Sequence, residues 1–275
     1  MTAPLDTPTP AREPADTCDA SEAAREPYDA LAAVYDRWTV ANDYPGWAAF
    51  VDARIPAASR VLDVCCGTGT MAELLLAAGH RVSGIDRSAA MLRQARRRLP
   101  VGTPLRQADL AGPVRVDGAG FADAGFDAAV CCFDSVNYFR TDEAIGNLFA
   151  FVSASLRPGG WFVFDVNTRR KLEDVFGSSH YGDDAGDFAY VWRNRYSAQR
   201  RSCEFAISLF VADRPDGGFT RHTESHEQRW FDQSELRGFA AAAGFTVDAV
   251  TDDYGEGLPT EQTLRESWVL RRGDG

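Results

Sequence analysis

Acid–base chemistry is suggested by a polar stretch at 222–226, which reads His-Thr-Glu-Ser-His. In a strand, side chains two residues apart lie on the same face, so His222, Glu224 and His226 would share one face. His226 is a candidate general base that Glu224 would orient, with His222 beside the substrate. A solvated polar strand face explains the same pattern. A metal site is disfavoured because the helical His-Glu-x-x-His spacing is absent, and we expect no bound metal.

A second set of polar side chains follows an apolar run at 126–133. The continuous run predicts a buried parallel strand, and ligands bind at the carboxyl ends of the strands in open α/β sheets. We therefore expect the residues directly after this strand to line a substrate pocket rather than to cap a helix: Asp134, Ser135, Asn137 and Tyr138. Tyr138 also joins His226 and Glu224 in the candidate catalytic set.

A nucleotide-type site is indicated by the stretch at 60–87. It reads as a buried strand, a turn with Gly67 and Gly69, a helix, and a second strand that ends at Asp86. Glycines in such a turn let a ligand approach the backbone, and a carboxylate at the end of the second strand can bind ribose hydroxyls. A purely structural turn is the alternative.

A short amphipathic helix is expected near the start of the chain, and it would carry three aromatic residues, Tyr28, Tyr35 and Trp38. A second helix is expected after the turn at 44–46. Tyr28 and Trp38 are candidate substrate contacts, and Tyr35 could cover a cofactor. As ordinary core aromatics they are equally well explained.

The elements that would position these residues alternate between strand and helix as far as Asn167, which predicts a parallel sheet with helices on both faces. After Phe176 the pattern changes. Alternating residues then predict three antiparallel strands, followed by a helix and two final strands, at 188–196, 202–212, 219–230, 245–251 and 264–270.

Three regions are expected along the chain. Residues 1–24 are rich in Pro, Ala, Thr, Asp and Glu and predict a disordered arm. Residues 25–58 predict a helical lid. Residues 59–275 predict the main domain, which includes the antiparallel insertion at 185–230.

The composition narrows the function classes. With 275 residues, 45% of them hydrophobic, the chain suits one α/β domain with an elaboration. Its net charge of −11 would repel phosphate backbones, so we expect no nucleic-acid partner. The chain has no apolar run of about 18 residues and no signal-peptide pattern, so we expect no membrane span and a cytoplasmic protein. The cysteine pairs at 65–66 and 131–132 fall in predicted strands, where neighbours point to opposite faces, so free thiols are expected.

Five stretches, in this order, resemble the motifs of class I S-adenosylmethionine-dependent methyltransferases. They are VLDVCCGTG at 61–69, GIDRSAAML at 84–92, RQADL at 106–110, FDAAVCCFDSVNY at 126–138 and LRPGGWFVFDV at 156–166. The resemblance covers residues 28–271 and implies a Rossmann-like α/β fold. That fold has a seven-stranded, mostly parallel sheet flanked by helices, with an antiparallel last strand, and in this chain the antiparallel β insertion would precede the sixth strand. Dinucleotide enzymes fit less well, because Gly67, Gly69 and Ala72 match their Gly-x-Gly-x-x-Gly pattern only loosely.

The resemblance implies S-adenosylmethionine as the cofactor. Asp86 would hold both ribose hydroxyls, Asp109 the adenine amino group and Asp63 the ammonium group. The expected cofactor-binding set is Tyr35, Asp63, Cys65, Gly67, Gly69, Asp86, Arg87, Met91, Asp109, Leu110 and Phe133. Cys65 stands where the family usually has its first glycine, and we expect an ordinary backbone φ there.

The implied activity is methyl transfer to a nitrogen, oxygen or carbon of a small molecule, such as an amino sugar or another secondary metabolite. The alternatives are an RNA or protein methyltransferase and a non-catalytic S-adenosylmethionine-binding protein. A prenyl-carbon or ketoacid acceptor is a further alternative, since four aromatics could surround a carbocation: Trp192, Phe205, Phe210 and Trp230. A homodimer is compatible with the sequence.

Overall fold

The computed structural model describes residues 28–114, 121, 125–177, 179–212 and 217–274. The predicted disordered arm at 1–24 lies outside these residues. So do residues 213–216 of the turn between the last two insertion strands.

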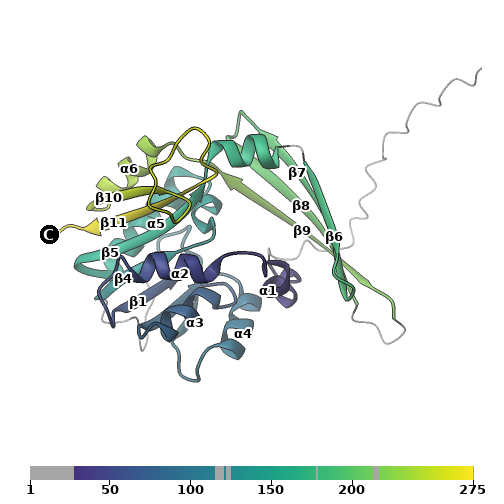
Figure 1. Cartoon of the computed structure of the whole chain (residues 1–275), viewed down its shortest axis with the longest axis horizontal. Helices are drawn as coiled ribbons and strands as arrows, with labels where there is room; N and C mark the ends of the chain where they lie inside the picture. Colours follow the sequence, from purple (N-terminus) through teal and green to yellow (C-terminus); the bar gives the residue numbers. More distant parts are fainter. Residues whose placement is uncertain (1–27, 115–120, 122–124, 178, 213–216, 275) are drawn as a thin grey trace, which may run out of the picture.

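A seven-stranded sheet lies at the centre of the protein (Figure 1). Its strand order is β10-β11-β5-β4-β1-β2-β3. Neighbouring strands are parallel except at β11, which runs antiparallel to both β5 and β10. The predicted mostly parallel sheet with an antiparallel last strand is confirmed. The strand bounds are β1 Arg60–Val64, β2 Arg81–Asp86, β3 Leu105–Gln107, β4 Phe126–Cys131, β5 Leu156–Asn167, β10 Phe245–Asp252 and β11 Arg265–Arg272.

Helices cover both faces of this sheet because its strands are apolar on both sides. In β1, Val61 belongs to the buried cluster of one face and Leu62 to that of the other. The first face packs against α2 (Tyr44–Asp52), α3 (Thr70–Ala77) and α4 (Ala89–Arg98). The second packs against α5 (Asp142–Ser155) and α6 (Gln233–Ala242).

Side-chain caps fix where several helices begin. Ser88 accepts a hydrogen bond from the Met91 amide at the start of α4, as its sequence position predicts. Thr141 caps α5 in the same way. At α6, Asp232 and Glu235 form a capping box.

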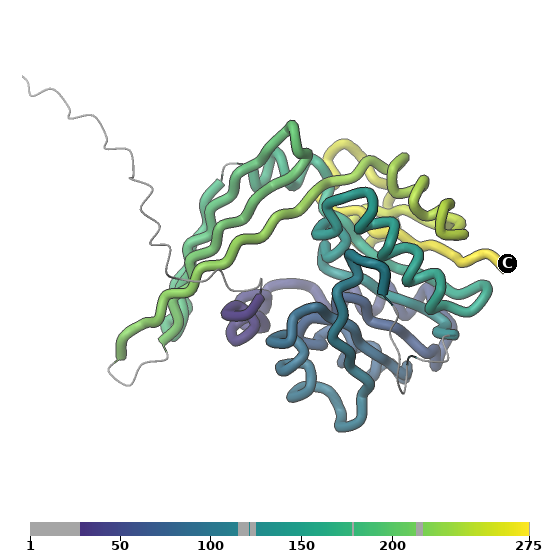
Figure 2. The backbone as a smooth tube through the Cα atoms, turned by 180° about the vertical axis from the view of Figure 1, so that it is seen from behind, coloured from purple at the N-terminus to yellow at the C-terminus, as the bar shows by residue number. Residues whose placement is uncertain are grey.

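A second, four-stranded antiparallel sheet lies between β5 and α6 in the chain and extends away from the central sheet (Figures 1 and 2). It follows the single π-helical turn η3, Lys171–Phe176. The antiparallel insertion is therefore confirmed, but β6 was not expected, because its five residues are all exposed and show no apolar alternation. The strand bounds are β6 His180–Asp184, β7 Phe188–Ser197, β8 Ser202–Val211 and β9 Thr220–Arg229.

The N-terminal segment, residues 28–43, packs against strands β7 and β8 of this second sheet. Instead of the single amphipathic helix expected, it forms a 3-10 turn, η1 (Leu31–Ala33), and one α-helical turn, α1 (Tyr35–Trp38). Leu31 and Val34 share a buried cluster with Phe188 of β7 and Leu209 of β8. The segment is therefore held by packing against the sheet, since helices this short are not stable alone.

The described part of the chain contains five cysteines, and all five are free thiols, Cys65 and Cys131 among them. No helix there is long and apolar enough to cross a bilayer. Nor is any group of three His, Cys, Asp or Glu side chains there placed to hold a metal ion.

The backbone at Cys65 corrects the expectation of an ordinary φ. Cys65 directly follows β1 and has φ +59°, in the left-handed region that favours glycine. The neighbouring Gly67 has φ +53°. The turn after β1 thus requires positive φ at Cys65 itself. A cysteine adopts this φ only at a conformational cost.

Replacing Cys65 tests this conformation. The Cys65→Gly variant should be more stable than Cys65→Ala by about 1 kcal/mol, because only alanine carries a Cβ that opposes positive φ. At an ordinary position the order is reversed. Urea unfolding of both variants measures the difference, and a Cys65→Ala variant at least as stable as Cys65→Gly would contradict the left-handed conformation.

Candidate functional site

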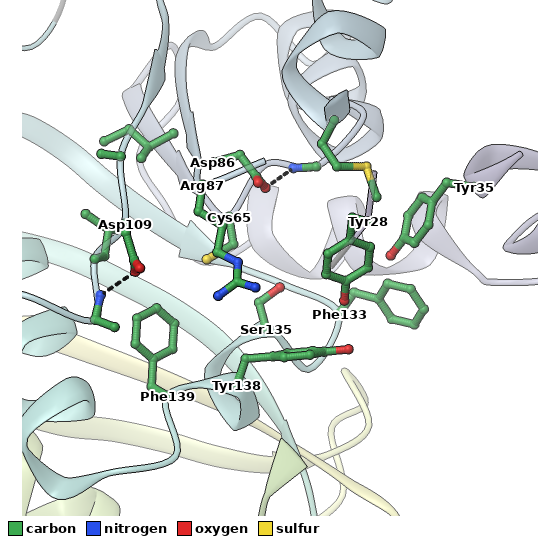
Figure 3. Close-up of a pocket in the computed structure, with 16 residues that line it drawn as sticks. Tyr28, Tyr35, Cys65, Asp86, Arg87, Asp109, Phe133, Ser135, Tyr138 and Phe139 are labelled. Carbon is green, nitrogen blue, oxygen red and sulfur yellow. Dashed lines mark hydrogen bonds between the residues drawn. The ribbon is translucent and has the colours of Figure 1, made fainter. Parts of the chain in front are cut away.

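The first cavity lies at the carboxyl ends of β1, β2, β3 and β4, where the ligand sites of open α/β sheets are found (Figure 3). Tyr28 and Tyr35 of the N-terminal segment close one side of it. The lining includes most of the expected cofactor-binding residues: Tyr35, Cys65, Gly67, Asp86, Arg87, Met91, Asp109, Leu110 and Phe133.

Two carboxylates of the first cavity are fixed by backbone hydrogen bonds. Asp86, at the end of β2, accepts from the Gly67 amide at 2.8 Å and the Ser88 amide at 2.7 Å. Burial raises the pKa of Asp86, although these amides oppose the shift. Asp109 accepts from the Ala111 amide at 3.0 Å (Figure 3). A carboxylate oxygen has a second lone pair, so both residues retain capacity to accept hydrogen bonds from a ligand.

A side pocket beside the first cavity contains Asp63 at the base of the turn after β1. Asp63 is 2% exposed, and its Oδ2 has no hydrogen-bond partner among the described residues. Burial, with a contribution from the charge of Asp86, raises its pKa to about 8. Ionising this buried carboxyl destabilises the folded state. The contribution of Asp63 to folding stability is therefore fully present at acid pH and is lost as pH rises toward 8. A buried carboxyl with one unpartnered oxygen is suited to bind a cationic ligand group.

Gly69 does not line either of these spaces. It has φ +84° and stands at the N-terminus of α3. A Cβ there would lie 3.1 Å from Leu99, which directly follows α4. Its contribution is the turn and the close packing of two helices rather than a cofactor contact.

The second cavity lies between the central sheet and the antiparallel sheet. It shares Tyr28, Tyr35, Phe133 and Tyr138 with the first cavity, so these four aromatics form a common wall. The rest of the lining is rich in aromatic and polar side chains: Trp38, Asn42, Asp134, Asn167, Lys171, Phe176, Tyr190, Trp192, Phe205, His226, Gln228 and Arg265.

Glu224 of β9 connects the antiparallel sheet to the N-terminal segment. Its carboxylate accepts hydrogen bonds from the backbone amides of Tyr28 at 2.8 Å, Ala30 at 2.8 Å and Leu31 at 2.9 Å. It is 5% exposed. Although burial acts to raise its pKa, hydrogen bonds from His226 and from the amides of Leu31 and Tyr28 hold it below the ordinary value. Glu224 is thus an ionised cap for the first turn of the N-terminal segment.

His226 lies between Glu224 and Tyr138. Its Nε2 is 3.0 Å from the Glu224 carboxylate, and its Nδ1 is 3.5 Å from the Tyr138 hydroxyl. An ionised carboxylate only accepts hydrogen bonds, so Nε2 carries a proton, and in the tautomer protonated at Nε2 alone the Nδ1 lone pair faces the Tyr138 hydroxyl. The Tyr28 ring packs edge-on against the imidazole, with centroids 4.7 Å apart. Burial raises the pKa of Tyr138, so its hydroxyl is neutral and can donate.

A buried ionic cluster reaches the second cavity through Asp134 and Arg265. Arg265 lies 3.0 Å from Asp134 and 3.2 Å from Asp165, although its Nε is not aligned for a hydrogen bond to Asp165. Tyr254 donates to Asp165 at 2.7 Å. Burial raises the pKa of Asp165, while the Arg265 charge opposes that shift.

The backbone is strained at Phe133, a residue of the common wall, and at its neighbour Asp134. These residues follow β4 and have φ +63° and φ +49°. Neither is glycine, so the surrounding contacts must hold this conformation. The amide of Asp134 donates to Asp165 at 2.8 Å, which is one such contact.

The structure does not bring every expected residue to the cavities. Asn137 is fully buried and uses its amide within the protein, donating to the carbonyls of Asn167 and Arg229 and accepting from the Asn167 amide. It therefore ties three segments together instead of facing a substrate. His222 lies in β9 opposite Leu209 and is absent from the lining of both cavities. Ser135 lines the first cavity rather than the second.

Sequence reasoning missed Lys171 and Arg265 in the second cavity. Arg265 pairs with Asn167 in the antiparallel register of β11 on β5, which places it at the carboxyl end of β5. The expected antiparallel last strand could have predicted this position of Arg265. Lys171 could have been singled out because it is the only lysine of the chain.

Comparisons with known proteins agree with this geometry. A family model described as a methyltransferase domain matches residues 61–160. YqeM of Bacillus subtilis, which carries a provisional methyltransferase name, is 32% identical over 240 residues, covering 86% of this chain and 94% of YqeM.

Two further relatives carry more specific names. The dTDP-3-amino-3,4,6-trideoxy-alpha-D-glucopyranose N,N-dimethyltransferase of Streptomyces venezuelae is 31% identical, covering 85% of this chain and 95% of that enzyme. The crystal structure of an S-adenosylmethionine-dependent methyltransferase from Clostridium acetobutylicum superposes with a TM-score of 0.75 at 26% identity. That match covers 90% of this chain and 99% of the Clostridium protein.

Asp63 should couple ligand binding to proton release. At pH 6.5 its raised pKa keeps the carboxyl protonated, and an ammonium group in the side pocket would favour the ionised form. Calorimetry with S-adenosylhomocysteine in two buffers of different ionisation enthalpy should show release of a proton. Asp63→Asn should release none and bind at least about tenfold more weakly, a loss of roughly 1.4 kcal/mol. Equal proton release in Asp63→Asn would contradict this role.

Proposed function

The chain belongs to the S-adenosylmethionine-dependent methyltransferases, and we propose that it methylates an amino group of a small molecule bound in the second cavity. The observation that carries the proposal is the common aromatic wall. A cofactor in the first cavity and an acceptor in the second would meet beside the lining residues that both cavities share, which include Tyr28, Phe133 and Tyr138.

The residues of the first cavity fit the cofactor. S-adenosylmethionine, when bound, supplies an electrophilic methyl group on a sulfonium. Asp86 and Asp109 have the acceptor capacity to bind the ribose hydroxyls and the adenine amino group. Asp63 has an unpartnered buried oxygen for the ammonium group.

The common wall would align the reactants and exclude water. Methyl transfer is an in-line displacement, so much of the rate enhancement comes from holding the nucleophile at the correct distance and direction. Tyr28 and Tyr35 reach the wall from the N-terminal segment, which Glu224 and the antiparallel sheet hold in place. Closure of this segment would therefore complete both cavities at once.

His226 would accept the proton that the amine loses. Its Nδ1 lone pair faces Tyr138 at the second cavity, while Glu224 holds the opposite nitrogen. Glu224 acts here as a positioning residue, because it orients the imidazole and stabilises the positive charge that the ring gains. Tyr138 is placed to hydrogen-bond either the base or the acceptor.

Two observations support a small amine as the acceptor. The second cavity has aromatic walls from Trp38, Tyr190 and Trp192, which suit a compact organic molecule and the cationic methylamine that forms. The Streptomyces relative is named for an amino-sugar acceptor, so an amino sugar is the first candidate here. Of the four aromatics considered for a carbocation, Phe210 and Trp230 do not line this cavity.

Activity is tested by following methyl transfer from isotope-labelled S-adenosylmethionine to a panel of amino sugars, simple amines, carboxylic acids, RNA and peptides. The proposal predicts transfer to a small amine. Transfer confined to RNA or peptides would contradict it.

Replacing His226 tests the proton acceptor. With a responsive amine, His226→Ala should lower kcat by about 10²- to 10⁴-fold, the usual contribution of general-base catalysis. S-adenosylhomocysteine binding should stay near wild type, because His226 is not in the lining of the first cavity. The matched control is His222→Ala, four residues earlier in β9, which should retain activity. Unchanged kcat in His226→Ala would remove His226 from the mechanism.

A further inference from the structure

Lys171 stands out because it is the only lysine of the chain and lies on the wall of the second cavity. It begins the π-helical turn η3, four residues after Asn167, the last residue of β5. Among the described residues, no carboxylate forms an ion pair with its amino group, whereas Arg265 of the same cavity pairs with Asp134 and Asp165. π-helical turns are frequently found at functional sites.

The surroundings of Lys171 place its charge inside the protein. Burial lowers its pKa, and the nearby charge of Arg265 lowers it further, while Asp134 and Asp165 act in the opposite direction. Those two carboxylates are already paired with Arg265 at 3.0 and 3.2 Å. A partly buried ammonium without its own counter-ion is costly, and an anionic ligand would remove that cost.

Two neutral donors of the second cavity lack a described hydrogen-bond partner. Among the described residues, the Nδ2 of Asn42 and the Nε1 of Trp192 are buried and make no hydrogen bond. Both residues line the cavity with Lys171. Asn167 contributes one unpartnered acceptor, its Oδ1. The excess of donors beside a cation is suited to oxygen atoms of a negatively charged group.

We propose that Lys171 is the centre of an anion subsite in the second cavity, which binds a carboxylate or phosphate group of the acceptor. The inference rests on the proposed function, because it assigns the second cavity to the acceptor. It adds that the acceptor carries an oxyanion in addition to the nucleophilic amine. Trp192 and Asn42 would donate to the same group, and Lys171 would set which amines are accepted.

The sole lysine allows a direct test. Protein grown with ¹³C-labelled lysine has one lysine side chain to observe by NMR, which is that of Lys171. With S-adenosylhomocysteine bound, titration with inorganic phosphate, pyrophosphate or succinate at constant ionic strength should shift its Cε–Hε signal saturably. Chloride and glycerol should not. A stronger response to phosphates indicates a phosphorylated acceptor, and a stronger response to succinate indicates a carboxylate.

Variants identify the cation responsible. Tryptophan fluorescence can follow the same anions, since Trp38 and Trp192 line the cavity. Lys171→Met should weaken the preferred anion at least tenfold, and Lys171→Arg should stay within a few-fold of wild type. Arg169→Met is the matched control, because Arg169 is an exposed cation two residues away that pairs with Glu173.

The proposal is overturned if no anion gives a saturable shift, or if Lys171→Met binds the anions as well as wild type does. These measurements require no methyl transfer. Failure of the anion subsite would therefore leave the amine acceptor untouched, and failure of amine methylation would leave the anion binding to be judged separately.

Discussion

The hydrogen bonds accepted by Glu224 connect the antiparallel sheet, the N-terminal segment and His226 at one carboxylate. Without them, three backbone amides at Tyr28, Ala30 and Leu31 would be left unpaired beside a buried charge. Each such loss costs about 1–3 kcal/mol. The short turns η1 and α1 have little stability of their own, so their position depends on this cap and on packing against β7 and β8. In the proposed mechanism, the same carboxylate that closes the site also orients the base.

The second sheet and the N-terminal segment complete what the central sheet begins. The central sheet presents Asp63, Asp86 and Asp109 at the carboxyl ends of its strands, where the proposed cofactor site lies. The antiparallel sheet adds the opposite wall of the second cavity and carries Glu224 and His226 on one face of β9. The N-terminal segment then contributes Tyr28 and Tyr35 to the wall that both cavities share. Three segments far apart in the sequence are needed to complete one site.

The sequence was most informative where local rules apply. Parallel strands bring their carboxyl ends to one edge, so the positions of Asp86 and Asp109 could be predicted from the order of strands and helices alone. The period of two in a strand likewise placed Glu224 and His226 together. That period could not show that Glu224 would cap the N-terminal segment, because the partner amides lie more than 190 residues away. Asn137 and Arg265 were misjudged or missed for the same reason: their partners are set by tertiary packing. At Cys65, residue type favoured an ordinary φ, and the turn geometry overrode it.

Amide hydrogen exchange of Glu224→Gln tests most directly whether this carboxylate holds the site closed. Glutamine keeps the shape but loses the charge and one acceptor oxygen. The account predicts that amides at 28–38 exchange at least about tenfold faster than in wild type, a change of roughly 1.4 kcal/mol in the opening equilibrium, while β1 and β4 are unchanged. Glu227→Gln is the control, since Glu227 lies on the same strand but pairs with Arg140, Arg200 and Ser202. Equal exchange at 28–38 in Glu224→Gln and wild type would contradict the central role of Glu224.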